Sequence, residues 1–174
     1  QGFKTLLIDA DLRKPSLSRI LFGEERKPGL SDVLGGIATL SEAVNACGVE
    51  GLHLLAAGSQ ASNPSELLAG DSFRKLLGEA MQGFDRIVID SPPILAVSDT
   101  LLIAPEVDAI CMVVRSFMTP SRILTRAIKS LGDTHLTPPS LIFNCVPLGN
   151  SSYDSYSYPG GHHFSYGNKG VYGG

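Results

Sequence analysis

Apolar and polar positions along this chain follow two periods, one typical of buried strands and one typical of amphipathic helices. Short apolar runs bounded by turn-forming residues predict strands at residues 6–8, 52–56, 87–89, 109–114 and 141–146. Apolar residues at helical spacing predict helices at 16–22, 40–47, 71–81, 98–104 and 119–131, with a brief helix within 29–34 and a helix start at 63–66. Strands that alternate with helices predict an α/β fold with a mostly parallel sheet covered on both faces.

Two of these helix starts carry residues that commonly cap helices. Thr39 or Ser41 is expected to cap the helix at 40–47, because a hydroxyl oxygen can accept a hydrogen bond from a free N–H of the first turn. Asn63 is expected to cap the next helix, with Pro64 in its first turn, where the missing N–H is not needed.

Acidic residues stand at the carboxyl ends of two predicted strands. Asp9 and Asp11 close the first strand two residues apart, so both side chains project the same way, and Arg13 follows at the same spacing. Asp90 closes the strand at 87–89, which brings it to the same edge of a parallel sheet, where ligands bind. Close carboxylates repel unless a cation or proton lies between them, and their hard oxygens suit Mg²⁺. A strand followed by a polar turn is the alternative for either strand taken alone.

Composition narrows the classes of partner. The chain has 174 residues, 43% of them hydrophobic, which suits one domain with a buried core, and its net charge of −3 gives no reason to expect nucleic acid. Cys47, Cys111 and Cys145 are widely spaced in apolar surroundings, which predicts reduced core thiols of a cytoplasmic protein. No apolar run approaches the roughly 18 residues of a membrane-spanning helix.

The composition changes near residue 150. Ser, Gly, Asn and Tyr dominate from there on, and that segment holds all five tyrosines of the chain: Tyr153, Tyr156, Tyr158, Tyr166 and Tyr172. Such a segment cannot bury enough apolar surface to offset its ordering entropy. We therefore expect a folded domain at 1–149 and a disordered, tyrosine-rich tail at 150–174.

Several motifs together resemble the bacterial tyrosine kinases (BY-kinases) of exopolysaccharide and capsule synthesis. The second Walker motif of that family, Walker A′, is similar to residues 6–15, Leu-Leu-Ile-Asp-Ala-Asp-Leu-Arg-Lys-Pro. The same family is matched, in the same order, by Asn-Pro-Ser-Glu-Leu-Leu at 63–68, Phe-Asp-Arg-Ile-Val-Ile-Asp-Ser-Pro-Pro at 84–93, Val-Val-Arg at 113–115 and the tyrosine-rich end. Only the combination is specific. The resemblance covers essentially the whole chain and implies a P-loop NTPase-like fold of the deviant Walker type, with ATP-dependent protein-tyrosine autokinase activity.

The resemblance implies a role for each of three carboxylates. Asp9 would help to deprotonate the attacking tyrosine hydroxyl, whose pKa of about 10 makes a positioned acceptor useful. Asp11 and Asp90, the latter as the Walker B acid, would hold the Mg²⁺ that bridges the phosphates of ATP.

Three further residues are candidates for the nucleotide site. Arg13 is a candidate to stabilise phosphate charge or to make a subunit contact. The alternative is a structural pair with a nearby acid, and the sequence favours neither the functional role nor the structural one. Arg115 and Asn144 end strands on the nucleotide side and are candidates to contact the base; the alternative is that both are satisfied turn residues.

One motif of the family does not occur in this sequence. A P-loop, G-x-x-x-x-G-K-[ST], is expected about 25 to 30 residues before Asp9, and no segment of the chain matches it. We therefore expect the C-terminal part of a kinase catalytic domain, without the P-loop strand and its helix. On its own such a fragment is expected to bind ATP poorly and to be inactive.

The resemblance also implies partners and a location. It implies a membrane-anchored activator, separate or fused, a cognate tyrosine phosphatase, a homo-oligomer, and a cytoplasmic position at the inner face of the plasma membrane. The five tail tyrosines would be autophosphorylated, against the alternative of a plain flexible end. Two other functions are alternatives: a deviant Walker ATPase that positions division sites or partitions plasmids, and a non-catalytic regulatory module without a P-loop. The tyrosine-rich end argues against the ATPase.

Overall fold

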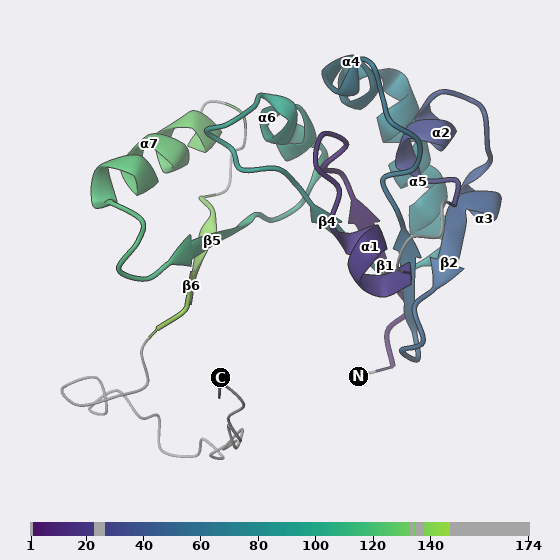
Figure 1. Cartoon of the computed structure of the whole chain (residues 1–174), viewed down its shortest axis with the longest axis horizontal. Coiled ribbons are helices and arrows are strands. Elements are labelled where there is room, and N and C mark those ends of the chain that lie inside the picture. The colour runs from purple at the N-terminus through teal and green to yellow at the C-terminus, as the bar shows by residue number, and fades with distance from the viewer. Residues whose placement is uncertain (1, 23–26, 133, 135–137, 147–174) are drawn as a thin grey trace, which may run out of the picture.

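The strands of the chain form two separate sheets (Figure 1). The structure is a computed structural model and describes residues 2–22, 27–132, 134 and 138–146. The larger sheet has the order β2-β3-β1-β4, formed by β2 (Val44–Ala46), β3 (Leu52–Leu55), β1 (Thr5–Asp9) and β4 (Arg86–Asp90). The smaller sheet pairs β5 (Cys111–Arg115) with β6 (Ser140–Asn144). Every pair is parallel except β2 with β3, so the predicted α/β fold with a mostly parallel sheet is confirmed.

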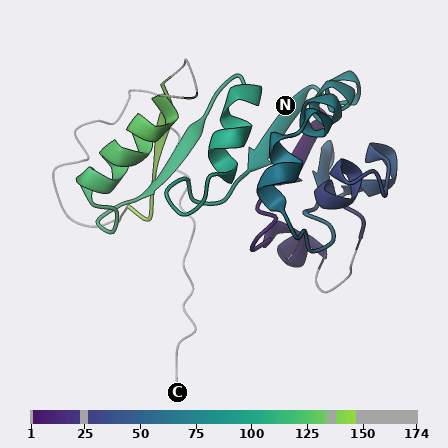
Figure 2. The same ribbon diagram turned by 90° about the horizontal axis from the view of Figure 1, so that it is seen from above.

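The helices gather into two groups around these sheets. Along the chain they are α1 (Leu17–Phe22), α2 (Leu30–Leu34), α3 (Leu40–Ala43), α4 (Pro64–Ala69), α5 (Asp71–Gly83), α6 (Asp99–Ile103), the 3-10 turn η1 (Ala104–Glu106) and α7 (Ser121–Gly132). Seen from above, α7 and the smaller sheet lie at one end of the molecule and α2 to α5 lie at the other (Figure 2). Across the described residues, no helix is both long and apolar enough to cross a bilayer.

The main core packs on the larger sheet. Leu6 and Ile8 of β1 are fully buried, as a strand covered on both faces requires. The amphipathic helix α5 contributes its predicted apolar side chains, with Phe73 only 1% exposed, and Leu30 of α2 fills the same cluster. This packing fixes β1, and with it the two acids that follow its apolar run.

The predicted helix at 40–47 is wrong in its second half. Thr39, not Ser41, begins it: the Thr39 Oγ1 accepts from the N–H of Glu42 at 3.4 Å, while the Glu42 carboxylate accepts from the N–H of Thr39 at 2.8 Å. The helix then ends after one turn, and Val44–Ala46 pairs antiparallel with β3. Pairing with a neighbouring strand overrides the weak helical preference of these residues.

Asn63 occupies the predicted N-cap position of α4, but its side chain does not make the capping hydrogen bond. Pro64 occupies the first turn of α4 as expected. The Asn63 Nδ2 donates instead to the Glu66 carboxylate at 3.0 Å. A charged acceptor makes a stronger hydrogen bond than a neutral one, which favours this side-chain contact. The other predicted elements lie within two residues of their expected bounds.

The second half of the chain is less covered than predicted. Val88 of β4 is 51% exposed and Val113 of β5 is 63% exposed, although both belong to continuous apolar runs that predict burial on both faces. Cys47 is partly buried, but Cys111 and Cys145 are exposed free thiols rather than core residues. The described part of the chain does not supply enough apolar surface to cover β4, β5 and β6.

Replacing Gly78 by alanine is expected to raise the free energy of unfolding by about 0.5–1 kcal/mol. Gly78 lies inside α5, and a Cβ built there meets no atom within 4 Å, so the change restricts the unfolded chain without crowding the folded one. The matched variant Gly58→Ala is expected to destabilise the fold, because Gly58 has φ +85° and its added Cβ would collide with the Asp32 carboxylate. Urea unfolding of both variants checks the two signs, and a less stable Gly78→Ala contradicts the first.

Candidate active site

The two strands β1 and β4 end side by side, and each ends in an aspartate. Asp9 and Asp90 are partners in the parallel register of these strands. The N–H of Ala10 donates to the Asp90 carbonyl at 2.8 Å, so the pairing continues one residue past the end of β1. Asp9 is fully buried and Asp90 is exposed. The two predicted strand-end acids therefore lie at one sheet edge, as expected from the sequence.

Asp9 is held by backbone donors on both carboxylate oxygens. Its Oδ1 accepts from the N–H of Asp11 at 3.3 Å, and its Oδ2 accepts from the N–H of Leu17, the first residue of α1, at 3.1 Å. Burial raises the pKa of the Asp9 carboxyl, these two hydrogen bonds oppose the rise, and the neighbouring charges of Asp90 and Asp11 add to it. The raised pKa makes Asp9 a better proton acceptor than an ordinary aspartate.

Asp11 and Asp90 are the pair that fits a divalent cation. The Asp11 Oδ1 accepts from the N–H groups of Arg13 at 3.2 Å and Lys14 at 2.9 Å, which turns the chain sharply after β1. Although the Asp90 side chain is exposed, partial desolvation of its carboxylate and the nearby charge of Asp11 raise its pKa, while the N–H of Ser91 lowers it. A cation between these carboxylates would remove their repulsion.

The carboxylates suit a magnesium site that the protein completes only in part. Among the described residues, no group of three or more His, Cys, Asp or Glu side chains is arranged to hold a metal ion. Mg²⁺ commonly binds through one or two carboxylates and takes its other ligands from water and phosphate. Asp11 and Asp90 fit that mode of binding.

Arg13 pairs with an acid from a distant part of the chain. Its Nε donates to Oδ2 of Asp99 at 2.7 Å and its Nη2 donates to Oδ1 at 3.0 Å. Ser65 Oγ donates to the same Asp99 oxygen at 2.7 Å and accepts from Arg13 Nη2 at 2.9 Å. The Asp99 side chain is fully buried, whereas that of Arg13 is 39% exposed. Of the two interpretations of Arg13, the structure has the pairing with a nearby acid.

Asp99 and Ser65 are the site residues that the sequence did not reveal. Asp99 falls at the start of the helix predicted at 98–104, where an acid already has a favourable partner in the helix dipole. Ser65 was expected only in the first turn of its helix. The usable signal was Arg13 itself, since a cation directly after a buried strand needs a partner. Its acid lies 86 residues away, and only the fold brings the two together.

Arg115 and Asn144 lie together, but on the other sheet. They are partners in the register of β5 and β6, and both side chains are exposed. The Asn144 Oδ1 accepts from the N–H of Cys145 at 2.8 Å, and its main-chain oxygen accepts from Ser116 at 2.9 Å. These bonds are those of a satisfied turn residue, and contact with a nucleotide base stays a prediction. The five tail tyrosines lie outside the described residues.

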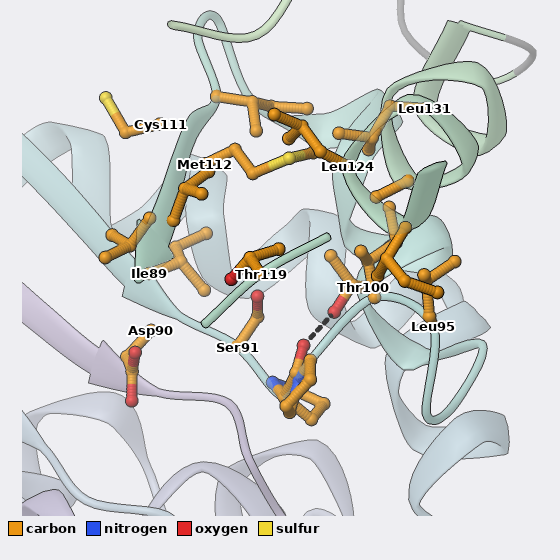
Figure 3. Close-up of a pocket in the computed structure, with 18 residues that line it drawn as sticks. Ile89, Asp90, Ser91, Leu95, Thr100, Cys111, Met112, Thr119, Leu124 and Leu131 are labelled. Atoms are coloured by element: carbon orange, nitrogen blue, oxygen red, sulfur yellow. Dashed lines mark hydrogen bonds between the residues drawn. The ribbon is translucent and has the colours of Figure 1, made fainter. Parts of the chain in front are cut away.

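A cavity of about 410 Å³ lies between the end of β4 with the loop that follows it and the β5 and α7 elements (Figure 3). Asp90 and Ser91 lie at its mouth on the side of β4, while Met112 of β5 and Leu124 and Leu131 of α7 form its apolar wall. Thr100 donates to the Pro92 carbonyl at 2.6 Å and so holds the loop that follows Asp90. The acidic edge of the larger sheet thus opens onto an apolar space.

Curated tyrosine-protein kinases match most of this chain, although no family model does. YwqD of Bacillus subtilis is 34% identical over 160 residues, which cover 92% of this chain and 66% of YwqD. CpsD of Streptococcus pneumoniae is 30% identical over 168 residues, which cover 97% of this chain and 72% of CpsD. EpsB of Ralstonia nicotianae, which also bears a tyrosine-protein kinase name, is 34% identical, and this chain spans a fifth of its length.

Solved structures include members of the same family and more distant proteins that share its fold. The crystal structure of the VpsO kinase domain superposes with a TM-score of 0.78 at 36% identity, over 84% of this chain and 72% of that domain. The septum site-determining protein MinD of Pyrococcus horikoshii has a TM-score of 0.64 at 21% identity, over 82% of this chain and 57% of that protein. The likeness to MinD shows the fold alone, which is that of the P-loop ATPases. Because the similarity to CpsD and VpsO extends over most of both partners in sequence, this chain belongs to the bacterial tyrosine-protein kinase family.

Proposed function

We propose that this chain forms the carboxylate-bearing part of an ATP-dependent protein-tyrosine autokinase that regulates exopolysaccharide or capsule synthesis. The observation that carries the proposal is the acidic edge, where Asp9, Asp11 and Asp90 converge and the pKa values of Asp9 and Asp90 are raised. Residues 1–149 are the catalytic part in this proposal, and 150–174 carry the phosphate acceptors. ATP is the phosphate donor.

In this mechanism each carboxylate has one task. Asp11 and Asp90 would hold Mg²⁺, which when bound would neutralise phosphate charge. Asp9 accepts the proton of the attacking tyrosine hydroxyl, and its raised pKa favours that transfer. Asp9 is fully buried, so the proposed transfer requires the residues that cover its carboxylate to move aside.

Arg13 acts through position in the proposed mechanism. Its guanidinium is held by Asp99, while its N–H donates to Asp11. The contact therefore fixes the turn that carries Asp11. In this proposal Arg13 does not itself contact phosphate. Arg13 and Asp99 are positioning residues in this proposal, and Arg115 and Asn144 are candidates for the base.

Phosphorylated tyrosines would change the assembly. Each phosphate adds roughly 1.5 to 2 negative charges, so several of them make the tail strongly acidic and weaken contacts between subunits of a homo-oligomer. A membrane-anchored activator would hold the kinase at the inner face of the plasma membrane, and a tyrosine phosphatase would reset it. The solved CapA2B2 protein is 27% identical to this chain with a TM-score of 0.79. Its name describes a chimera, which supports a kinase that works with a second protein.

The test incubates the full-length gene product that carries this chain with Mg-ATP and reads the tail by mass spectrometry. We expect phosphate on one or more of the residues Tyr153, Tyr156, Tyr158, Tyr166 and Tyr172. The 174-residue chain alone is expected to stay unmodified, because it lacks a P-loop. ATP hydrolysis with an unmodified tail would favour the positioning ATPase, and absence of both nucleotide binding and phosphate would favour the regulatory module.

Replacing Asp90 by asparagine is expected to stabilise the metal-free chain at neutral pH. Partial desolvation and the charge of Asp11 raise the pKa of Asp90, so the wild type loses stability as the pH rises from 3.8 through that raised pKa. Asparagine does not ionise, so the variant escapes this loss, and its advantage grows with pH. The gain stays under about 1 kcal/mol because Asp90 is exposed to solvent.

Urea unfolding at acid and neutral pH, with and without Mg²⁺, measures this advantage. Mg²⁺ is expected to stabilise the wild type more than the variant, since only the wild type keeps both carboxylates. The matched control is Asp108→Asn, an exposed aspartate outside the acidic edge. An Asp90→Asn variant that is most stabilised at acid pH contradicts the assignment.

A further inference from the structure

Charged residues are distributed unevenly along this chain. Residues 109–132, which include β5 and α7, contain four Lys or Arg residues and no Asp or Glu, whereas the other 150 residues contain 10 Lys or Arg and 17 Asp or Glu. The four bases are Arg115, Arg122, Arg126 and Lys129. A positive region on an otherwise acidic chain indicates an anionic partner.

Three of these bases lie along one face of α7. Arg122, Arg126 and Lys129 are spaced four and three residues apart, which places them together on the helix surface. All three are exposed, while Ala127 and Leu131, on the opposite face, are buried. With a rise of about 1.5 Å per residue, the three bases span roughly 10 Å. We call Arg122, Arg126 and Lys129 the basic stripe of α7.

The basic stripe has no acid to neutralise it. No ion pair or side-chain hydrogen bond joins its three residues to any other residue that the structure describes. In contrast, Arg13 and Arg74 each bind a carboxylate through two nitrogens. Like charges four residues apart destabilise a helix, so the stripe brings α7 no benefit of its own. An anionic ligand would remove that repulsion.

The chain continues into its tail from a point beside the connection that leads into α7. β5 and β6 end together, with Arg115 opposite Asn144. The N–H of Ser116, the first residue after β5, donates to the Asn144 carbonyl at 2.9 Å. Val146 is the last described residue, and the seven residues from there to Tyr153 extend to at most about 24 Å. The tail tyrosines are therefore attached within reach of the basic stripe.

The charge of the tail depends on phosphorylation. Residues 147–174 contain one acid, Asp154, and one base, Lys169, apart from two histidines, so the unmodified tail has little attraction for a basic helix. Each phosphotyrosine adds about 1.5 to 2 negative charges and three acceptor oxygens. Arginine guanidinium groups bind phosphates through two parallel N–H donors. Phosphorylation would thus create a ligand that is complementary to the stripe.

We propose that the basic stripe of α7 is a phosphotyrosine-binding face, and that its occupant is the phosphorylated tail of the same chain. Arg122 and Arg126 bind one phosphate between them, and Lys129 binds a second. The tail is favoured over an anionic membrane because its attachment beside α7 gives it a high effective concentration there. A docked tail is withdrawn from neighbouring subunits. The proposal rests on the proposed function for the source of the phosphates.

The test measures binding of a synthetic tail peptide to the 174-residue chain by fluorescence anisotropy at about 50 mM salt. The peptide covers residues 150–174 and carries phosphate on Tyr153, Tyr156 and Tyr158. We expect it to bind about tenfold or more tightly than the same peptide without phosphate. Because the phosphates are introduced by synthesis, the result does not depend on whether the protein phosphorylates itself.

A double variant locates the binding face. Arg122→Gln combined with Arg126→Gln removes two charges from the stripe and is expected to weaken phosphopeptide binding by about tenfold or more. The matched control, Arg19→Gln combined with Lys75→Gln, removes two exposed charges from α1 and α5 and is expected to weaken it by less than about twofold. All four side chains are exposed, so both variants are expected to fold.

A second preparation tests whether the tail docks on its own chain. Ligation at Cys145 joins a synthetic peptide of residues 145–174, with the same three phosphotyrosines, to the rest of the chain. The ligated chain is expected to be monomeric and to bind added phosphopeptide about tenfold more weakly than the unmodified chain, because its own tail occupies the stripe. A dimer that forms as the ligated chain is concentrated would place the tail on a second copy and overturn the intrachain assignment.

Four other outcomes would overturn the proposal. The first three are equal affinity for the peptides with and without phosphate, a stripe variant that binds like the wild type, and a control variant that loses as much affinity as the stripe variant. The fourth is binding to phosphatidylserine vesicles without binding to the phosphopeptide, which would assign the stripe to a membrane surface. Tight phosphopeptide binding together with a full-length product that does not phosphorylate its tail would refute the proposed function and leave the docking face supported.

Discussion

Replacing Asp99 by alanine is expected to lower the free energy of unfolding by about 3 kcal/mol. Asp99 is fully buried and accepts three hydrogen bonds, two from Arg13 and one from Ser65. The variant loses a charge-assisted pair whose acid is shielded from water, and it leaves the Ser65 hydroxyl without its buried acceptor. Urea unfolding of the 174-residue chain at neutral pH measures the loss.

A second ion pair of the same geometry provides the control. Arg74 donates through Nε to one Glu106 oxygen at 3.1 Å and through Nη2 to the other at 2.7 Å. Glu106 is 20% exposed and the Arg74 side chain 69%, so water screens this pair. Glu106→Ala is expected to lower the free energy of unfolding by only about 0.5 kcal/mol. Equal losses in the two variants would mean that burial does not determine the strength of the Asp99 pair.

The effect of Asp99→Ala depends on pH with a definite sign. The Arg13 hydrogen bonds hold the pKa of Asp99 below its ordinary 3.8, so its carboxylate stabilises the fold above that value. This stability is lost as the pH falls through the lowered pKa. The gap between wild type and variant is therefore expected to shrink below about pH 4, and a gap that widens in acid contradicts the assigned pairing.

Asp9→Asn is expected to reduce tail autophosphorylation in the full-length gene product by about 100-fold or more. Asparagine keeps the size of the side chain but cannot take up the proton of the tyrosine hydroxyl. Affinity for ATP is expected to change little, since Mg²⁺ is assigned to Asp11 and Asp90. Initial rates of tyrosine phosphorylation and a separate nucleotide titration distinguish the two effects.

The pH profile and a companion variant complete this experiment. Because the pKa of Asp9 is raised, the rate is expected to increase as the pH rises through that value and Asp9 becomes an acceptor. Asp90→Asn is expected to raise the Mg²⁺ concentration needed for half-maximal rate. If Asp9→Asn keeps a normal rate while Asp90→Asn loses its pH dependence, the exposed Asp90 is the proton acceptor instead.

The acidic edge could be predicted from the sequence because it depends on local order alone. Asp9 and Asp90 each follow a buried apolar run, and parallel strands bring their carboxyl ends together without further information. The family was predicted for the same reason, since its motifs are short and continuous.

Features that depend on distant contacts could not be predicted. The strand Val44–Ala46 forms because β3 lies beside it, which nothing in its own three residues indicates. The Arg13–Asp99 pair joins segments 86 residues apart. The exposure of Val88 and Val113 depends on which neighbours the sheet has, and apolar composition alone predicted burial.

The hydrogen bond from Leu17 to Asp9 makes the short helix α1 part of the electrostatics of the site. The bond lowers the pKa of Asp9, against the burial that raises it. Displacement of α1 would remove that donor and let the carboxyl take up a proton at higher pH. Ile20 of α1 is 72% exposed, so the helix offers an apolar surface that a partner can bind. Displacement of this short helix would therefore change the pKa of a carboxyl at the acidic edge.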